Sequence, residues 1–299
     1  MVVQGVNPTA RRWELAARLR QLRLDAGRSV DDAARELMCS PAKISRMETA
    51  GRGVQPRDVR DLCRLYGTSD AVRDDLMQAV ADARKPGWWQ DFRTLDDQVQ
   101  TFLGLEAAAA EVRFLDPQRL PGMLQNADYT AALLPQLRPP GELTDEWMAD
   151  TVASRGKRYD RVSSGELTLK VILDEAALRR PIGGVTVMLK QIDRLIRDST
   201  LPNVTLQVVP FEVGPYPGLE GSFQHLTFPS GYLEDVAFVE GLLGTFLLDK
   251  QAETDRYLAV FDDISRRFAL SASRTKTWLR ELRAELEATK PRLRNAGGG

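Results

Sequence analysis

The sequence predicts an α+β protein, with an all-α amino-terminal domain of five helices followed by a larger domain of helices and a mixed sheet. Apolar residues recur at helical spacing through residues 12–83. Beyond residue 166, several short segments alternate apolar and polar residues as strands do. A length of 299 residues suits about two domains, and the Pro-Gly pair after Lys85 interrupts the helical pattern. We therefore expect domains over 1–85 and 86–299.

Helix-ending signals define the first two helices. Leu15 and Leu19 lie on one face of the first helix, and Gly27 supplies a left-handed residue that ends it. The second helix opens at Ser29, whose hydroxyl can cap free backbone N–H groups, and it runs to about Met38. Only a few residues separate this helix from the next, so the two are joined by a tight turn.

The third helix has Ser40 as its cap and Pro41 in its first turn, where a missing N–H costs no hydrogen bond. Ile44 and Met47 face the core. The opposite face is predicted to be open to solvent, and it carries Ala42, Lys43, Ser45 and Arg46. A fourth helix over Pro56–Tyr66, ended by Gly67, and a fifth over 70–83 complete the domain.

A short polar face on an otherwise apolar helix suits the major groove of B-DNA. Arg46 is able to make a bidentate contact, most readily with guanine O6 and N7, and Lys43 suits a phosphate. The alternative is an ordinary solvated face with an intrahelical ion pair. Residues 1–85 carry 16 Lys or Arg against 12 Asp or Glu, and the remainder carries 25 against 30. This mild positive bias of the first domain favours a polyanionic partner.

Residues 27–37 and 40–48 together resemble the helix-turn-helix of the phage repressor and Cro family, also called the Xre family, over residues 12 to about 83. The resemblance implies that the third helix is the recognition helix and that double-stranded DNA is the partner. The residues expected to contact DNA are Arg28, Ser29, Ser40, Pro41, Ala42, Lys43, Ser45, Arg46 and Arg52.

One position departs from this family, because Val30 stands where members often carry a Gln that anchors a phosphate. Backbone N–H groups near Ser29, with Arg28 or Arg52, are the alternative anchor. Two further arginines, Arg57 and Arg60, follow the recognition helix. Together with Arg52 they are equally compatible with phosphate contacts and with ordinary solvated surface positions.

The second domain begins with helices and continues into a sheet. Helical patterns are predicted over 99–113 (through Ala109 and Val112), 129–134 and 148–154, so helices dominate to about residue 162. Strands are predicted over 166–173, 204–209, 223–228, 236–239 and 245–248. A helix over 185–199 connects the first two strands, which indicates a mixed sheet with a crossover, and helices over 253–268 and 273–288 end the chain.

This domain also resembles a known one. Residues 115–134, 173–184, 201–211, 221–223 and 239–241 are similar to the domain that follows the helix-turn-helix in actinobacterial regulators of the WhiJ-like group. Together, the two resemblances cover residues 12–288. They imply a transcription factor, often linked with a small partner protein in an arrangement likened to antitoxin and toxin, whose own ligand is undefined.

The candidate ligand- or partner-binding residues of the second domain are Trp88, Trp89, Gln125, Tyr129, Glu175, Arg179, Arg180 and His225. The paired tryptophans are expected to hold one module to another rather than to form a ligand platform. Asp174 and Glu175 could be a general acid and base, but no nucleophile or metal ligand accompanies them, and Arg179 is placed for an ion pair with Glu175. His225 is expected to be a sheet residue, with pH sensing as the alternative.

Composition argues against most enzymes. One histidine cannot build a two-histidine zinc site, and the two cysteines, Cys39 and Cys63, are read as small buried hydrophobes. Dinucleotide- and phosphate-loop motifs are missing, as are a secretory signal and an apolar run of about 18–20 residues. We expect a cytoplasmic, homodimeric DNA-binding regulator without cofactor or metal. An antitoxin-like interaction module is the first alternative, and an enzyme in the second domain is the other.

Overall fold

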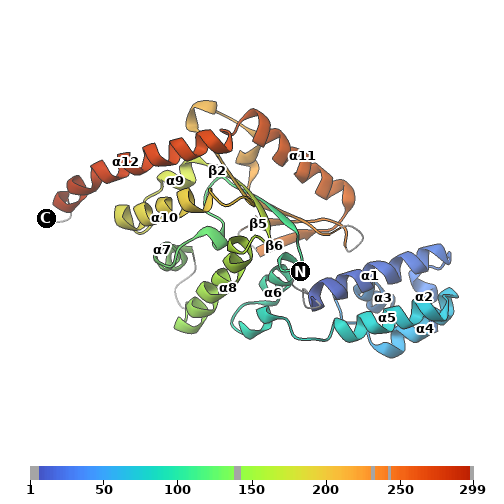
Figure 1. Cartoon of the computed structure of the whole chain (residues 1–299). Helices are drawn as coiled ribbons and strands as arrows, with labels where there is room; N and C mark the ends of the chain where they lie inside the picture. The colour runs from blue at the N-terminus through green and yellow to red at the C-terminus, as the bar shows by residue number, and fades with distance from the viewer. Residues whose placement is uncertain (1–6, 138–142, 230–232, 242–243, 297–299) are drawn as a thin grey trace. The chain divides into compact units, whose positions relative to one another are not determined.

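The computed structural model describes residues 7–137, 143–229, 233–241 and 244–296 (Figure 1). The chain is α+β, as predicted, and forms two compact units. Among the described residues, the amino-terminal unit contains 7–91 and 97–108, with Pro229 and Leu233. The sheet unit contains the others. Within the described residues, no helix is both long and apolar enough to cross a lipid bilayer.

Six α-helices lie in the described part of the amino-terminal unit. They are α1 (Pro8–Asp25), α2 (Val30–Glu36), α3 (Pro41–Glu48), α4 (Pro56–Tyr66), α5 (Asp70–Asp82) and α6 (Asp97–Glu106). The first five confirm the predicted helices. The unit extends past residue 85 because α6 packs against the start of α1: Asn7 Nδ2 donates to Gly104 O at 2.8 Å. The division into a DNA-binding and an effector domain stays a prediction.

The predicted helix ends are confirmed in detail. The Ser29 hydroxyl accepts from Asp32 N, and the backbone N–H of Ser29 donates back to the Asp32 carboxylate, which completes a capping box. Ser40 accepts from Lys43 N at 3.3 Å, and Gly67 ends α4 at a φ of 67°. These residues fix where the helices begin and end. The helices share a core whose buried members include Leu15, Leu19, Ala33, Ala34, Ile44, Met47, Leu62, Cys63 and Leu76, and Cys39 packs at its edge.

The turn between α2 and α3 contains a strained residue. Met38 has a φ of 46° and is 92% exposed, so its side chain gains little from packing. A left-handed conformation costs an L-residue more than it costs glycine. We expect Met38→Gly to raise the free energy of unfolding by about 0.5–1 kcal/mol in urea denaturation. Met38→Ala, which keeps the Cβ, is the control and should change stability little; a destabilised glycine variant would contradict the expectation.

The sheet unit is built on a six-stranded mixed sheet. Its strands are β1 (Glu111–Asp116), β2 (Thr168–Asp174), β3 (Val204–Val209), β4 (Phe223–Thr227), β5 (Val236–Gly241) and β6 (Gly244–Leu248), in the order β3-β2-β1-β4-β5-β6. The three strands β1, β2 and β3 are parallel, and the others are antiparallel. Leu115 of β1 pairs with Ile172 of β2 and with Phe223 of β4.

Helices cover both faces of this sheet. They are α7 (Ala127–Leu137), α8 (Asp145–Ser163), α9 (Glu175–Arg179), α10 (Gly184–Asp198), α11 (Gln251–Arg267) and α12 (Ala272–Ala296). Figure 1 shows α11 on one side of the sheet and α7, α8, α10 and α12 on the other. Phe261 and Ile264 of α11 are buried against Leu115 and Ile172. The crossover helix and the last two helices of the chain are confirmed.

One predicted helix is wrong in its second half. The pattern over 99–113 predicts a helix through Ala109 and Val112, but α6 ends at Glu106 and β1 begins at Glu111. Val112, Phe114 and Leu115 are buried because β1 lies between β2 and β4, with helices on both faces. A strand buried on both faces loses the polar alternation that identifies strands, and the preceding alanines extend the helical pattern.

Candidate nucleic-acid interface

The recognition-type helix α3 has one buried and one open face. Ile44 and Met47 are 0% and 1% exposed and fix the helix in the core. The exposed residues at the start and on the open face are Ser40, Pro41, Ala42, Ser45 and Arg46. The helix therefore presents a short row of small and polar side chains and one large cation.

Arg46 is the cation of this face. It is exposed, and its side chain makes no ion pair or hydrogen bond with the described residues. Its backbone carbonyl accepts from Arg52 N at 3.0 Å, which ties the helix to the following loop. The alternative of an intrahelical ion pair at this position is thus not found in the described part of the chain, and the guanidinium keeps all its donors for a ligand.

Lys43 differs from the expectation. Its Nζ lies 3.0 Å from Oδ1 of Asp58 in α4, and the two side chains are only 17% and 6% exposed. The side chain is therefore directed toward α4 and does not belong to the open face of α3. The physical reason is that Asp58 is buried and requires a charged partner, which only the tertiary fold brings near.

A second buried ion pair, which was not predicted from the sequence, joins α1 to the end of α3. Arg23 donates to both carboxylate oxygens of Glu48, at 2.7 and 2.8 Å, and to the carbonyl of Arg28 at 2.9 Å. The side chains are 10% and 5% exposed, and the hydrogen bonds to Glu48 raise the pKa of Arg23. Its sequence signal is the position of Arg23 four residues after Leu19, on the buried face of α1.

The predicted phosphate anchors are only partly available. The backbone N–H of Ser29 donates to Asp32 Oδ2 at 2.9 Å, so it is already occupied by a carboxylate. Hydrogen bonds from Ser29 hold the pKa of Asp32 below its usual value. Arg28 and Arg52 are exposed, and their side chains form no hydrogen bond or ion pair within the described part of the chain. The arginines are therefore better placed than the Ser29 amide to bind a phosphate.

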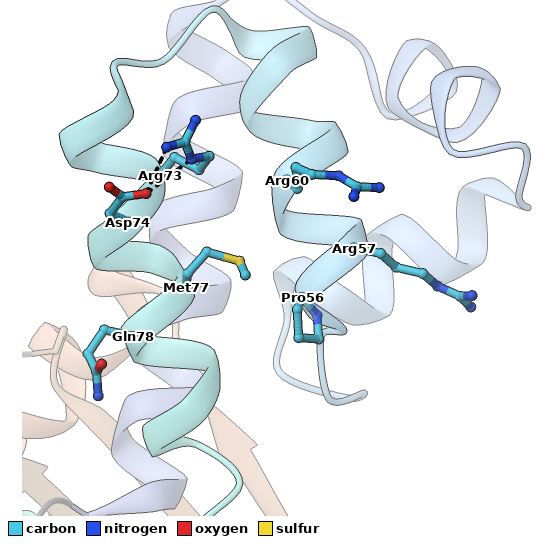
Figure 2. A pocket seen from close by; sticks show the side chains of 7 residues that line it. All are labelled: Pro56, Arg57, Arg60, Arg73, Asp74, Met77 and Gln78. Atoms are coloured by element: carbon cyan, nitrogen blue, oxygen red, sulfur yellow. Dashed lines mark hydrogen bonds and ion pairs between the residues drawn. The ribbon is translucent and has the colours of Figure 1, made fainter.

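A groove between α4 and α5 contains the arginines that follow α3. It has a volume of about 480 Å³. Figure 2 shows Arg57 and Arg60 extending away from α5, whereas Arg73 bends back to Asp74. Arg60 is paired with Asp61 at 3.0 Å. Arg57 lies 4.0 Å from Asp58 Oδ1, and Lys43 is closer to the same oxygen, at 3.0 Å. Among Arg57, Arg60 and Arg73, Arg57 therefore has the weakest ion pair.

The paired tryptophans lie in the short 3-10 helix η1 (Trp88–Asp91) of the amino-terminal unit. Their rings meet edge to face, with centroids 5.8 Å apart, and Trp89 is buried. A Cβ on Gly87 would lie 2.3 Å from the Trp89 ring, so only glycine fits beside it. Their expected role in joining two modules stays a prediction.

Gln125 and Tyr129 are internal. Gln125 donates to the Leu120 carbonyl at 2.8 Å and accepts from Arg155 at 2.5 Å. Tyr129 is fully buried, and burial raises its pKa to about 12. Burial and the neighbouring Arg158 lower the pKa of Arg155 to about 10. Arg155, which was not predicted from the sequence, supports the Gln125 side chain from α8.

The carboxylates after β2 have structural partners. Glu175 pairs with Arg179, as predicted, and its second oxygen accepts from Phe211 N at 2.8 Å. Asp174 caps α9 and accepts from the Tyr216 hydroxyl at 2.9 Å. Arg179 also contacts Glu285 of α12 at 3.0 Å, and the adjacent Arg180 is exposed. These contacts join the end of β2 and α9 to the segment that follows β3 and to α12.

His225 is a buried sheet residue. It is 1% exposed in β4, where it is paired with Arg113 of β1 and Ala237 of β5. Its Nε2 lies 3.7 Å from Asp235 Oδ2. Burial lowers the pKa of the imidazole despite that carboxylate, so the neutral form is favoured near neutral pH.

The fold and the open face of α3 define a helix-turn-helix protein of the DNA-binding class. Comparison with known families supports this class, because residues 14–76 match a helix-turn-helix domain. Residues 99–281 match the family described as "Domain of unknown function (DUF5753)", and the chain belongs to that family. Comparison with curated proteins and with solved structures gave no match.

Proposed function

We propose that this chain is a sequence-specific transcriptional regulator of the Xre type that reads double-stranded operator DNA through α3. The observation that carries the proposal is Arg46, whose guanidinium forms no ion pair with the described residues and lies on the exposed face of a helix whose other face is buried. A bidentate donor in that position suits guanine O6 and N7. The helix-turn-helix match over residues 14–76 supports the same conclusion.

The proposal assigns phosphate contacts to Arg28, Arg52 and Arg57. Each is exposed, and each lies in sequence close to α2, α3 or the start of α4. Phosphate contacts fix the position of a protein on the duplex, and base contacts carry the sequence information. We assign the second role to Arg46 alone among the cations of α3, because Lys43 is paired with Asp58.

A single recognition helix makes few base contacts, so the proposed active form is a cytoplasmic homodimer on a two-fold operator with half-sites about 34 Å apart. The resemblance to the WhiJ-like group of actinobacterial regulators supports a sheet unit that senses an effector or holds a small partner protein. In the antitoxin-like alternative, holding the partner is the main task and DNA binding autoregulates it. The proposal assigns no catalytic activity to the chain.

The test uses DNA selected by the full-length protein from a random library, with affinities measured by gel shift at fixed salt. Arg46→Ala should cost about 1–3 kcal/mol of specific binding and relax preference at one base position. Arg20→Ala is the control, because Arg20 is an exposed arginine of α1 and the charge change is the same. Equal affinity of wild type and Arg46→Ala for the selected DNA would overturn the assignment.

A further inference from the structure

A basic pocket lies in the sheet unit, where residues of α7, α8 and α10 meet. Its volume is about 430 Å³, within the range of small-molecule sites. The lining residues that matter for its chemistry are Asn126, Asp128, Tyr159, Lys190, Arg194 and Arg197. Three cations and one carboxylate line the pocket, and Arg194 is also paired with Asp198, so a net positive charge remains that favours an anion.

The three cations come from one face of α10. Lys190, Arg194 and Arg197 are separated by four and three residues, which places them on the same side of the helix. Arg197 is exposed and forms no ion pair with the described residues. Lys190 Nζ lies 2.6 Å from Asp128 Oδ2, but both side chains are about half exposed. Such surface pairs contribute little, so an incoming anion is able to compete for the ammonium group.

Arg194 forms the fixed part of the pocket. Its guanidinium donates to Asp198 at 3.2 Å and to the carbonyls of Gln125 and Met123, each at 2.9 Å. It also lies 4.1 Å above the ring of Tyr159, whose hydroxyl donates to Asp198 at 2.8 Å. Arg194 therefore contributes a positive charge at a fixed position, while Lys190 and Arg197 supply the adaptable donors.

The start of α7 adds donors to this pocket. Asn126 Oδ1 accepts from Tyr129 N at 2.8 Å and so caps the helix. The Asn126 Nδ2 group is shielded from solvent and has no hydrogen-bond partner among the described residues. The first N–H groups of an α-helix lack partners within the helix and carry a partial positive charge. An unpaired amide donor beside a helix start indicates that an acceptor is missing.

We propose that this pocket binds a small molecule through a phosphate-type oxyanion. Its donors are the Arg197 guanidinium, the Lys190 ammonium once an anion displaces Asp128, a carboxamide and helix N–H groups, and a tetrahedral oxyanion can accept from all of these directions. The volume leaves room for more than a bare phosphate, so the ligand class is a phosphorylated small molecule. Any effect of this ligand on DNA affinity rests on the proposed function, but its binding does not.

The experiment measures thermal unfolding of the full-length chain with inorganic phosphate or phenyl phosphate, against potassium chloride at equal ionic strength. Binding to the folded state alone should raise Tm in a saturable way, by about 3–6 °C at ten times Kd. Phenyl phosphate should saturate at lower concentration than inorganic phosphate. A rise that follows ionic strength alone would overturn the proposal.

Variants locate the binding site. Asn126→Asp keeps the helix cap but replaces the free donor with a carboxylate, and it should abolish the phosphate-induced rise. Lys190→Met and Arg197→Met should each weaken binding about tenfold or more. Lys157→Met and Arg256→Met are matched controls, because both residues are exposed and lie outside the pocket lining. Unchanged binding in the three pocket variants would contradict the assignment.

The same variants show whether the pocket binds a phosphorylated small molecule or the phosphates of DNA. If Lys190→Met and Arg197→Met weaken binding to duplexes of any sequence while wild type shows no response to either phosphate probe, the pocket contacts DNA and the proposal fails. If Arg46→Ala loses specific binding to the selected DNA but keeps the rise in Tm with phenyl phosphate, the two sites are separate. Failure of one proposal is thus distinguishable from failure of the other.

Discussion

Replacing Glu48 with Gln is expected to lower the free energy of unfolding of the amino-terminal unit by about 3–5 kcal/mol. The carboxylate accepts two hydrogen bonds from Arg23, and both side chains are nearly buried. A neutral amide leaves the guanidinium without a counter-charge in a place that water barely reaches. Urea denaturation, followed by amide hydrogen exchange in α1 and α3, measures the loss.

The control for this prediction removes both charges. Arg23→Met with Glu48→Leu should be far more stable than Glu48→Gln alone, because apolar side chains of similar size can replace a buried pair. Such a recovery identifies the unpaired charge, rather than lost volume, as the cause. A loss of less than about 1 kcal/mol in Glu48→Gln would show that the pair is hydrated in solution.

Lys43→Met is expected to lower the free energy of unfolding by about 1–3 kcal/mol. The methionine keeps an apolar stem but removes the closer cation of the buried Asp58 carboxylate, which leaves only Arg57 at 4.0 Å. Arg46→Ala, on the open face of the same helix, should change stability by no more than about 0.5 kcal/mol. Thermal or urea unfolding of the two variants side by side provides the comparison.

DNA binding distinguishes the two possible roles of Lys43. If this residue positions α3 through Asp58, the folded Lys43→Met variant should bind with an unchanged salt dependence. If it instead contacts a phosphate, the slope of log affinity against log salt should fall by about one. The second result would contradict the ion pair as the main role of Lys43.

The sequence predicted the amino-terminal unit well because its signals are local. Ser29 and Ser40 cap helices within three residues of themselves, and Gly67 ends α4 by its own conformation. Strand β1 was missed because Val112 and its neighbours are buried on both faces. Its identity as a strand depends on β2 and β4, which lie far away in the sequence.

The functional residues also divide into those that local sequence predicts and those that only tertiary contacts reveal. Arg46 was found because helical periodicity alone places it opposite Ile44 and Met47. The pairs Lys43–Asp58 and Arg23–Glu48 join different helices, so spacing within one helix cannot reveal them. The basic face of α10 was present in the sequence, but the start of α7, which completes the pocket, is brought beside it only by folding.

The packing of α6 on α1 has a practical consequence for dissecting the protein. The polypeptide passes from one unit to the other after residues 91, 96 and 108, and again on either side of Pro229 and Leu233. A Cβ on Gly104 would lie 2.3 Å from the hydroxyl of Thr9. A fragment that stops at residue 85 would lack α6, so the first turn of α1 would be exposed to solvent. An isolated amino-terminal fragment should therefore extend through residue 108.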